Sequence, residues 1–303
     1  MERKVSISTH RFQAFFGDCE ALEIAKRIGA DGVDFNTCNS TFDYRKPQSI
    51  YSKSDDEIYE YFRGLKKLAD KLGIEIFQTH GRITGYKNDL KEDEACLLNA
   101  RLDCIAASAM EVKACIIHSV STISMGPETP PEVMRDINFK MFNDILKYAK
   151  QYNVNIATET FGDSPPHNCC DFFGNINEFI ATYDRICSVG DNAKYLSVCV
   201  DTGHSNKAMR YNNPTPGDVI RMLGGNISTL HLHDNDTLTD QHKIPLTGTI
   251  DWKDVLNALD EVGYAGAYNL ELALRDFGNN LIIDEAEFAI KVMREMLRSH
   301  YGA

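Results

Sequence analysis

The chain has 303 residues, of which 43% are hydrophobic and 25% are charged, as in a soluble globular protein with a large core. Its formal net charge of -12 disfavours a general nucleic-acid binder, because Lys and Arg supply most of the affinity for phosphate backbones. The N-terminus runs straight into a strand-like alternation, and no apolar stretch reaches membrane-spanning length. We therefore expect a cytoplasmic protein without a membrane partner.

Nine cysteines are scattered along the chain without a CxxC pair or a disulfide framework, so we expect them to be reduced. Cys115 and Cys199 lie in apolar, strand-like runs, where a free Cys behaves as a small buried hydrophobe. The adjacent Cys169 and Cys170 are expected in a loop, and the lack of partner cysteines favours packing over metal binding there.

Short apolar runs alternate with longer segments of helical period along the whole chain, which is typical of βα units and a parallel sheet. Helix start and stop signals lie between the runs, as at Ser54 before a segment ending at Gly73 and at Asp251 before a segment ending at Gly263. A closing helix is expected over residues 283–297. The expected strands start near Val5, Gly32, Ile74, Ala114, Val154, Leu196, Ile227 and Gly266.

These repeated units predict an α/β fold, a single (β/α)8 TIM barrel that spans residues 1–303 as one domain. An open doubly wound sheet usually has fewer strands, and a dinucleotide-binding one needs a Gly-rich loop after its first strand. The segment SISTHRFQAFFG is not such a loop. No GxGxxG, P-loop or GxSxG motif occurs, so nucleotide binding and serine hydrolysis have no motif support.

Residues of metal-ligand type end six of the expected strands. Because the C-terminal ends of barrel strands converge on one rim, these side chains should face a single pocket. Taken singly, each is as well explained by a helix cap or a loop hydrogen bond. Together they would repel or stay unpaired without a cation, and a divalent metal satisfies them at once. The six are His80, His118, Glu159, Asp201, His231 and Glu271.

Two spaced pairs extend this set. Asp201 and His204 lie three residues apart in DTGHS, and Asp240 and His242 lie two apart in DQH. Mixed oxygen and nitrogen donors without Cys favour Mn²⁺, Zn²⁺, Co²⁺ or Mg²⁺ over a thiolate-bound structural zinc.

The segment HLHDND leaves the choice of its metal ligand open. Alternation places His231 and His233 on the same side of an extended strand, so it cannot choose between them. Asp234 and Asp236 widen the choice further. The position at the strand end favours His231.

Several motifs together resemble the xylose isomerase-like superfamily of TIM barrels, which groups sugar isomerases and epimerases with endonuclease IV. The motifs are ATETFG, DTGHS, HLHDND followed by DQH and TGTIDW, and the final NLEL. The resemblance covers nearly the whole chain and is specific for the superfamily, not for one activity. It implies a metal held by Glu159, Asp201, His231 and Glu271.

The resemblance to sugar epimerases implies that Glu159 and Glu271 also act as acid and base on opposite faces of a substrate carbon. One would remove a proton α to a metal-polarised carbonyl and the other would return it, while the cation stabilises the enediolate. The expected function is therefore a divalent-metal-dependent isomerase or epimerase of a sugar or sugar phosphate. The candidate substrate contacts are His204, His80, His118 and Phe161.

Other features bear on the substrate. Ketose 3-epimerases of this superfamily carry an Arg shortly after the metal His, where this chain has Thr237 or Thr239, which argues against that activity. No cluster of Arg, Lys and Gly marks a phosphate site. Aromatic rings near the expected rim loops could stack on a sugar, although core packing explains each one singly. They are Phe12, Phe35, Phe161 and Phe173.

Two other activities stay open. Endonuclease IV-like enzymes bind three zinc ions through nine residues, and the motif matches add five residues to the four above, so more than one metal is permitted. The acidic balance and isolated basic residues such as Arg45 and Lys46 stand against DNA as a partner. The additional candidate ligands are His80, His118, His204, Asp240 and His242.

The second alternative is elimination. Some superfamily members cleave carbon glycosides from oxidised substrates with a small partner subunit, and nothing in the sequence separates this chemistry from isomerisation. Both a homo-oligomer and such a subunit are compatible with the sequence. A non-enzymatic metal or sugar binder is disfavoured, because it would not need two opposed carboxylates beside the cation.

Overall fold

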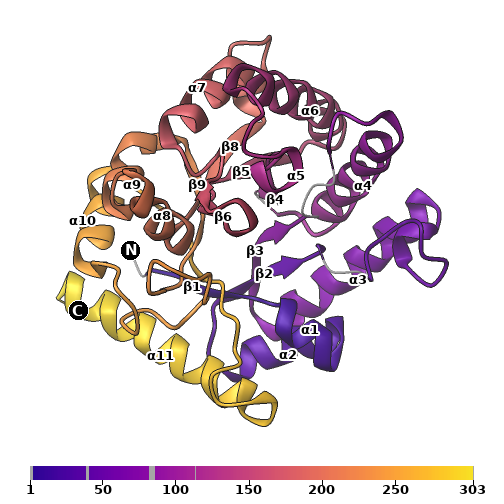
Figure 1. Ribbon diagram of the computed structural model, residues 1–303. Helices are drawn as coiled ribbons and strands as arrows, with labels where there is room; N and C mark the ends of the chain where they lie inside the picture. The colour runs from indigo at the N-terminus through magenta and orange to yellow at the C-terminus, as the bar shows by residue number, and fades with distance from the viewer. Residues whose placement is uncertain (1–2, 39–40, 82–85, 113, 303) are drawn as a thin grey trace.

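Eight parallel strands form a barrel ringed by helices (Figure 1). The computed structural model describes residues 3–38, 41–81, 86–112 and 114–302. The predicted (β/α)8 barrel is confirmed. Its strands are β1 (Val5–Ser8), β2 (Gly32–Asn36), β3 (Glu75–His80), β4 (Ala114–Ile117), β5 (Asn155–Glu159), β8 (Leu196–Asp201), β9 (Ile227–His231) and β10 (Tyr268–Leu270).

The last strand, β10, starts at Tyr268, two residues later than expected. Two others, β3 and β5, start one residue later than expected, for a shared reason. The N–H groups of Ile74 and Val154 donate to the carbonyls of Ala69 and Ala149, in the last turns of the preceding helices. Each follows a residue in the left-handed conformation, Gly73 or Asn153, that ends the helix. These residues therefore complete a helix C-cap and do not join the strand ladder.

The sheet closes at the junction between β9 and β10. Neighbouring strands pair in the order β10-β1-β2-β3-β4-β5-β8-β9. Just beyond β9, Leu232 forms a parallel bridge with Leu270. The N–H of Leu232 donates to the Asn269 carbonyl (2.8 Å), and the N–H of Glu271 donates to the Leu232 carbonyl (3.2 Å). These bonds join the two end strands into a barrel.

The helices follow the expected start signals. The Ser54 hydroxyl and the Glu57 carboxylate form a capping box, and the Asp251 carboxylate accepts the N–H of Asp254 (3.1 Å). The closing helix is longer at both ends than expected. The α-helices are α1 (His10–Phe16), α2 (Asp18–Arg27), α3 (Asp55–Leu72), α4 (Leu90–Ala109), α5 (Thr122–Met125), α6 (Pro131–Tyr152), α7 (Ile176–Cys187), α8 (Thr202–Ala208), α9 (Pro216–Leu223), α10 (Trp252–Glu261) and α11 (Ile282–Tyr301).

Short 3-10 turns supplement these helices: η1 (Ile50–Ser52), η2 (Pro165–His167), η3 (Asn192–Lys194), η4 (Met209–Tyr211), η5 (Gly224–Asn226) and η6 (Asn279–Leu281). Among the described residues, none of the helices combines the length and apolar character that crossing a bilayer requires.

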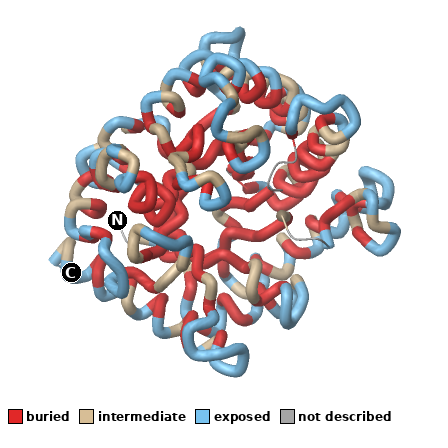
Figure 2. The backbone as a smooth tube through the Cα atoms, viewed as in Figure 1, coloured by how far each residue is buried: buried red, intermediate tan, exposed pale blue. Residues whose placement is uncertain are grey.

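Alternation along the strands separates two apolar cores. A small cluster of Ala114, Ile116, Ala157 and Cys199 is distinct from the large core, to which the intervening Cys115 and Ile156 belong. Successive strand residues face opposite sides of a sheet, so the small cluster fills the barrel and the large one lies under the helices. Figure 2 shows the buried chain at the centre and the exposed chain on the periphery.

The cysteines behave as expected with one correction. All nine are free, and Cys115 and Cys199 are buried. Cys169 and Cys170, however, do not lie in a loop. They form β7 (Cys169–Cys170), which pairs antiparallel with β6 (Asp163–Ser164). The hairpin turns through Asn168, whose φ of 49° suits the left-handed conformation that Asn tolerates.

Candidate functional site

Strand register explains why ligand-type side chains point into the barrel. Ile116, Ala157 and Cys199 face the barrel interior. Two residues further along the same strands or their direct extensions come His118, Glu159 and Asp201, which therefore point to the same side. All three are buried. The alternation that packs the barrel thus also delivers these polar groups to its C-terminal end.

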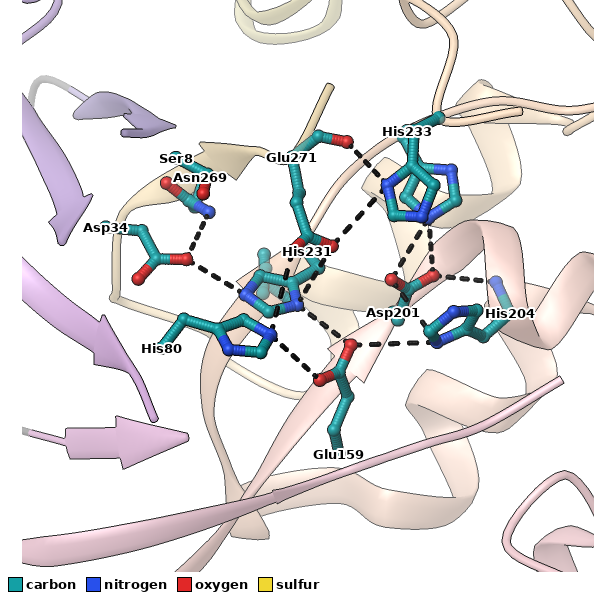
Figure 3. A network of polar contacts seen from close by, with 12 residues as sticks. Ser8, Asp34, His80, Glu159, Asp201, His204, His231, His233, Asn269 and Glu271 are labelled. Atoms are coloured by element: carbon teal, nitrogen blue, oxygen red, sulfur yellow. Dashed lines mark hydrogen bonds and ion pairs between the residues drawn. The ribbon is translucent and has the colours of Figure 1, made fainter. Parts of the chain in front are cut away.

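His231 lies at the centre of the site, between carboxylates on both sides (Figure 3). Its Nδ1 is 2.8 Å from Glu159 Oε1 and 3.4 Å from Glu271 Oε2. Its Nε2 is 3.1 Å from Asp34 Oδ2. One ligand atom from each of Glu159, Asp201, His231 and Glu271 lies within 4.8 Å of the others. The structure thus brings together the four residues of the expected metal site.

A second group shares Glu159. His118 Nε2 lies 2.8 Å from Glu159 Oε2 and 3.2 Å from His80 Nε2. The His80 ring stacks on His231, with ring centroids 5.2 Å apart. His80, His118 and Glu159 therefore form another cluster whose ligand atoms converge.

A third group lies on the Asp201 side and contains His204, His233, Asp240 and His242. The Asp240 carboxylate is 3.5 Å from His204 Nε2 and 3.2 Å from His242 Nε2. The His233 ring stacks on His242 at 3.8 Å between centroids, and its Nε2 is 3.0 Å from Asp201. The structure thus places both His231 and His233 at the site, with His231 nearer to the glutamates.

Backbone carbonyls fix the orientation of three imidazoles. The Nδ1 atoms of His80, His204 and His242 lie 2.9, 3.1 and 3.1 Å from the carbonyls of Gly81, Thr160 and Glu271. A carbonyl only accepts, so each Nδ1 carries the proton. In the neutral rings Nε2 then presents a lone pair to the other side, which is the arrangement of a metal-ligating histidine.

The carboxylates and imidazoles of the site shift one another's pKa values. Burial raises the pKa of Glu271, but His231, His242 and His80 outweigh it and lower that pKa to about 2. Burial lowers the pKa of His242, but Asp240 and Glu271 raise it to about 9. Glu271 is therefore ionised, and the protonated form of His242 is stabilised.

The same residues fit a divalent cation. His233 Nδ1 is buried and has no hydrogen-bond partner among the described residues. Buried polar atoms without partners are costly, and the oxygen and imidazole donors suit Zn²⁺, Mn²⁺ or Co²⁺. A cation would take the role that protons on the imidazoles otherwise fill.

The site opens into a pocket of about 530 Å³. Of the four aromatic residues proposed to stack on a sugar, Phe161 lines this pocket, with its ring 5.8 Å from His118 and 4.8 Å from His204 between centroids. Phe12, Phe35 and Phe173 are at most 1% exposed and belong to the large core. The stacking role considered for these three is therefore wrong, because helix packing encloses them.

Sequence reasoning missed two residues of the pocket region at the first two strands. His10 lies two residues after the end of β1 and lines the pocket, where burial lowers its pKa to about 4 and keeps the ring neutral. Asp34 in β2 is fully buried and contacts His231. A search for ligand-type residues at strand ends, which identified the other ligands, would have found His10. Asp34 escapes such a search because it lies two residues before its strand ends.

Comparison with curated relatives gives partial matches. A 133-residue match to the uncharacterised protein y4fM of Sinorhizobium fredii is 26% identical and covers 44% of this chain and 38% of that protein. A 138-residue match to the uncharacterised protein MJ1311 of Methanocaldococcus jannaschii is 30% identical and covers 45% of this chain and 43% of that protein. The match thus spans less than half the length of these two relatives. An inosose isomerase of Halalkalibacterium halodurans is 25% identical over 260 residues, covering 83% of this chain and 81% of that protein.

Solved structures share the fold at low sequence identity. A D-tagatose 3-epimerase-like protein superposes with a TM-score of 0.73 at 18% identity and covers 99% of this chain and 98% of its own. The IOLI protein with a bound zinc atom superposes with a TM-score of 0.71 at 17% identity, and the superposition covers 98% of this chain and 97% of that protein. A family model described as xylose isomerase-like TIM barrel matches residues 22–300. Because that match takes in nearly all of the chain, the protein belongs to the xylose isomerase-like TIM barrel family.

Proposed function

We propose that this protein is a divalent-metal-dependent isomerase or epimerase of a sugar, a polyol ketone or one of their phosphates. One observation carries the proposal: the buried carboxylates of Glu159 and Glu271 both contact Nδ1 of His231, at 2.8 and 3.4 Å. The two glutamates come from strands β5 and the end of β10, which are not neighbours in the barrel. They can therefore approach one substrate carbon from two directions.

The residues of the chain supply the acid and the base. A cation held by Glu159, Asp201, His231 and Glu271 would polarise a substrate carbonyl and stabilise the negative charge that develops on its oxygens. One glutamate takes the proton from the carbon next to the carbonyl, and the C–H electron pair moves to form the enediolate. The other glutamate, once it has taken up a proton from the substrate hydroxyl or from water, delivers it to the opposite face for epimerisation. For isomerisation it delivers the proton to the former carbonyl carbon, and the hydroxyl proton of the neighbouring carbon moves to the former carbonyl oxygen.

Other rim residues orient the substrate. The imidazoles of His80, His118 and His204 lie within the same pocket and offer hydrogen bonds to hydroxyl groups. The Phe161 ring between His118 and His204 offers an apolar surface to the C–H face of a sugar and excludes water from the reacting carbon. The relative that is an inosose isomerase supports a polyol ketone among the candidate substrates.

Solvent exchange tests this proposal directly. The protein, supplied with Mn²⁺, Zn²⁺ or Co²⁺, is incubated in D₂O with an inosose, a ketohexose, its phosphate and a 3-oxo-glycoside, and the products are followed by NMR. We expect deuterium at the carbon next to the carbonyl of at least one ketone, and loss of this exchange in Glu159→Gln. Release of the aglycone from the 3-oxo-glycoside would assign elimination instead. Absence of exchange with every ketone would contradict the proposal.

A second candidate function is phosphodiester hydrolysis. The observation that favours it is the third ligand cluster, His204, His233, Asp240 and His242, which together with the His80, His118 and Glu159 cluster gives a site for more than one metal. The net charge of -12 disfavours a DNA substrate. Metal-dependent cleavage of an abasic-site duplex, with no ketone exchange, would establish this activity in place of the first.

A further inference from the structure

Two arginines that are distant in sequence line the same pocket. Arg11 lies in α1, just after β1, and Arg275 lies in the segment that follows β10. Both line the same pocket as Glu159 and Glu271. Strands β1 and β10 are parallel neighbours, so the chain segments that leave their C-terminal ends lie side by side. The guanidinium of Arg11 donates to the Asn279 side chain (3.4 Å), which belongs to the segment after β10.

Neither guanidinium has an ionic partner. In the part of the chain that the structure describes, no carboxylate lies within 4.0 Å of Arg11 or Arg275. Several other arginines do pair, as Arg101 does with Asp55 and Arg221 with Asp254, both at 2.7 Å. The Nε atom of Arg11 is also buried and has no hydrogen-bond partner. In a chain with a net charge of -12, two unpaired arginines on one pocket leave donors free for an anion.

The two ends of the pocket carry opposite charges, with a carboxylate at the inner end and an arginine at the mouth. Glu159 is 1% exposed and lies at the inner end, whereas Arg275 is exposed. Small side chains, Ala14 and Ala273, line the pocket close in sequence to the two arginines. Their size leaves space beside the guanidinium groups, whose planar geometry matches carboxylates and phosphates.

We propose that the substrate carries a carboxylate or phosphate at the end remote from its reacting carbon, and that Arg11 and Arg275 bind this anionic group. The assignment of the reacting carbon to the inner end rests on the proposed function. The anion site itself rests on the two unpaired arginines. A neutral sugar or polyol would leave both guanidinium groups without an anionic partner in the complex.

A matched set of unreactive ligands tests the inference. D-arabinitol, D-arabinonate and D-arabinitol 1-phosphate differ only at C1 of a common polyol chain and have no aldehyde or ketone, so none can be turned over. Their dissociation constants are measured by calorimetry on the metal-loaded protein. We expect at least one anionic ligand to bind about tenfold or more tightly than arabinitol, and the tighter of the two identifies carboxylate or phosphate as the preferred group.

Variants assign this preference to the arginines. Arg11→Gln combined with Arg275→Gln should remove the advantage of the anionic ligand while leaving arabinitol binding and metal content unchanged. Arg298→Gln, which removes a charge from the surface of α11, should retain the advantage. Equal affinity for all three ligands, no binding of any of them, or a preference that survives in the double variant would each overturn the inference.

The result is separable from that of the proposed function. An arginine-dependent preference for the anion without carbon-bound deuterium exchange on any ketone would refute the reaction and retain the anion site. Exchange on a neutral ketone, with no preference for an anion, would retain the reaction and refute the inference.

Discussion

The two ends of the barrel contain cavities of similar size and different chemistry. The cavity at the N-terminal end, lined by Lys4, Glu75 and Ser228, has about 500 Å³, and the pocket at the C-terminal end has about 530 Å³. At the first end the charged pair Arg3 and Asp260 is 30% and 35% exposed. At the second end Glu159 and His231 are buried at 1% and below. Buried titratable groups facing one another, and not cavity size, distinguish the candidate site.

The largest expected difference between the two ends is in catalysis. Glu159→Gln and Glu271→Gln should each lower the rate of proton exchange by about a thousandfold, because each removes a general acid or base. Glu75→Gln at the N-terminal end should change the rate less than about twofold. Rates of deuterium incorporation measure all three variants. Full activity in either Glu159→Gln or Glu271→Gln would refute the acid and base roles.

Metal binding should stabilise the protein through the C-terminal end. At a free Zn²⁺ concentration of about 100 times the dissociation constant, the expected gain is ~2.7 kcal/mol, or a rise in Tm of about 4 °C for a chain of this length. His231→Ala should abolish the rise. His300→Ala, which removes an imidazole that contacts Asp260 near the other end, should retain it. Thermal unfolding with Zn²⁺ and with a chelator provides the measurement, and an equal Tm in both would argue against a metal centre.

Packing at the two ends should respond differently to one added methyl group. A Cβ on Gly203 would lie 1.9 Å from Cε1 of His233, whereas a Cβ on Gly225, just before β9, would meet nothing within 4 Å. Gly203→Ala should therefore cost about 2 kcal/mol in the free energy of unfolding. Gly225→Ala should change it little. Denaturant titration of both variants tests this, and equal stabilities would show that His233 can move without penalty.

We expect Asp34 to raise the metal affinity of the site without binding the metal itself. Its carboxylate accepts a hydrogen bond from Nε2 of His231 (3.1 Å) if the cation binds at Nδ1. Asp34→Asn keeps the shape but weakens this bond, so we expect about a tenfold loss of metal affinity. Asp31→Asn, before β2 at the N-terminal end of the barrel, is the control. Competition with a metal-sensitive dye measures both affinities, and unchanged affinity in Asp34→Asn would remove its positioning role.

The sequence was sufficient for the fold and for most of the candidate ligands. The repeated alternation of strand and helix periods predicts the barrel, and the strand-end rule places His80, Glu159 and Asp201 on one rim. These inferences succeed because strand polarity and side-chain alternation are local properties. The roles of the ligands, like the extent of the domain, stay predictions.

Other features depend on long-range packing and could not be read from a local pattern. His231 and His233 share one strand face, and their separate surroundings arise from contacts with β2, β5 and α8. Phe35 and Phe161 look equivalent in sequence, yet helices enclose the first and leave the second on the pocket. Arg11 and Arg275 line one pocket because the first and last strands of the barrel pair. Each distinction requires the three-dimensional arrangement.

The junction of β9 and β10 gives the site a further property. In the described chain these strands are joined through the single bridge at Leu232 and Leu270, whereas every other adjacent pair in the barrel shares three or more paired residues. We therefore expect the barrel to open most easily at this junction, and amide hydrogen exchange of Leu232 and Glu271 would report the opening. Since His231 and Glu271 flank the junction, an ion bound between them would link the two strands across it. Ion binding and opening of the barrel would then be coupled, so that each shifts the equilibrium of the other.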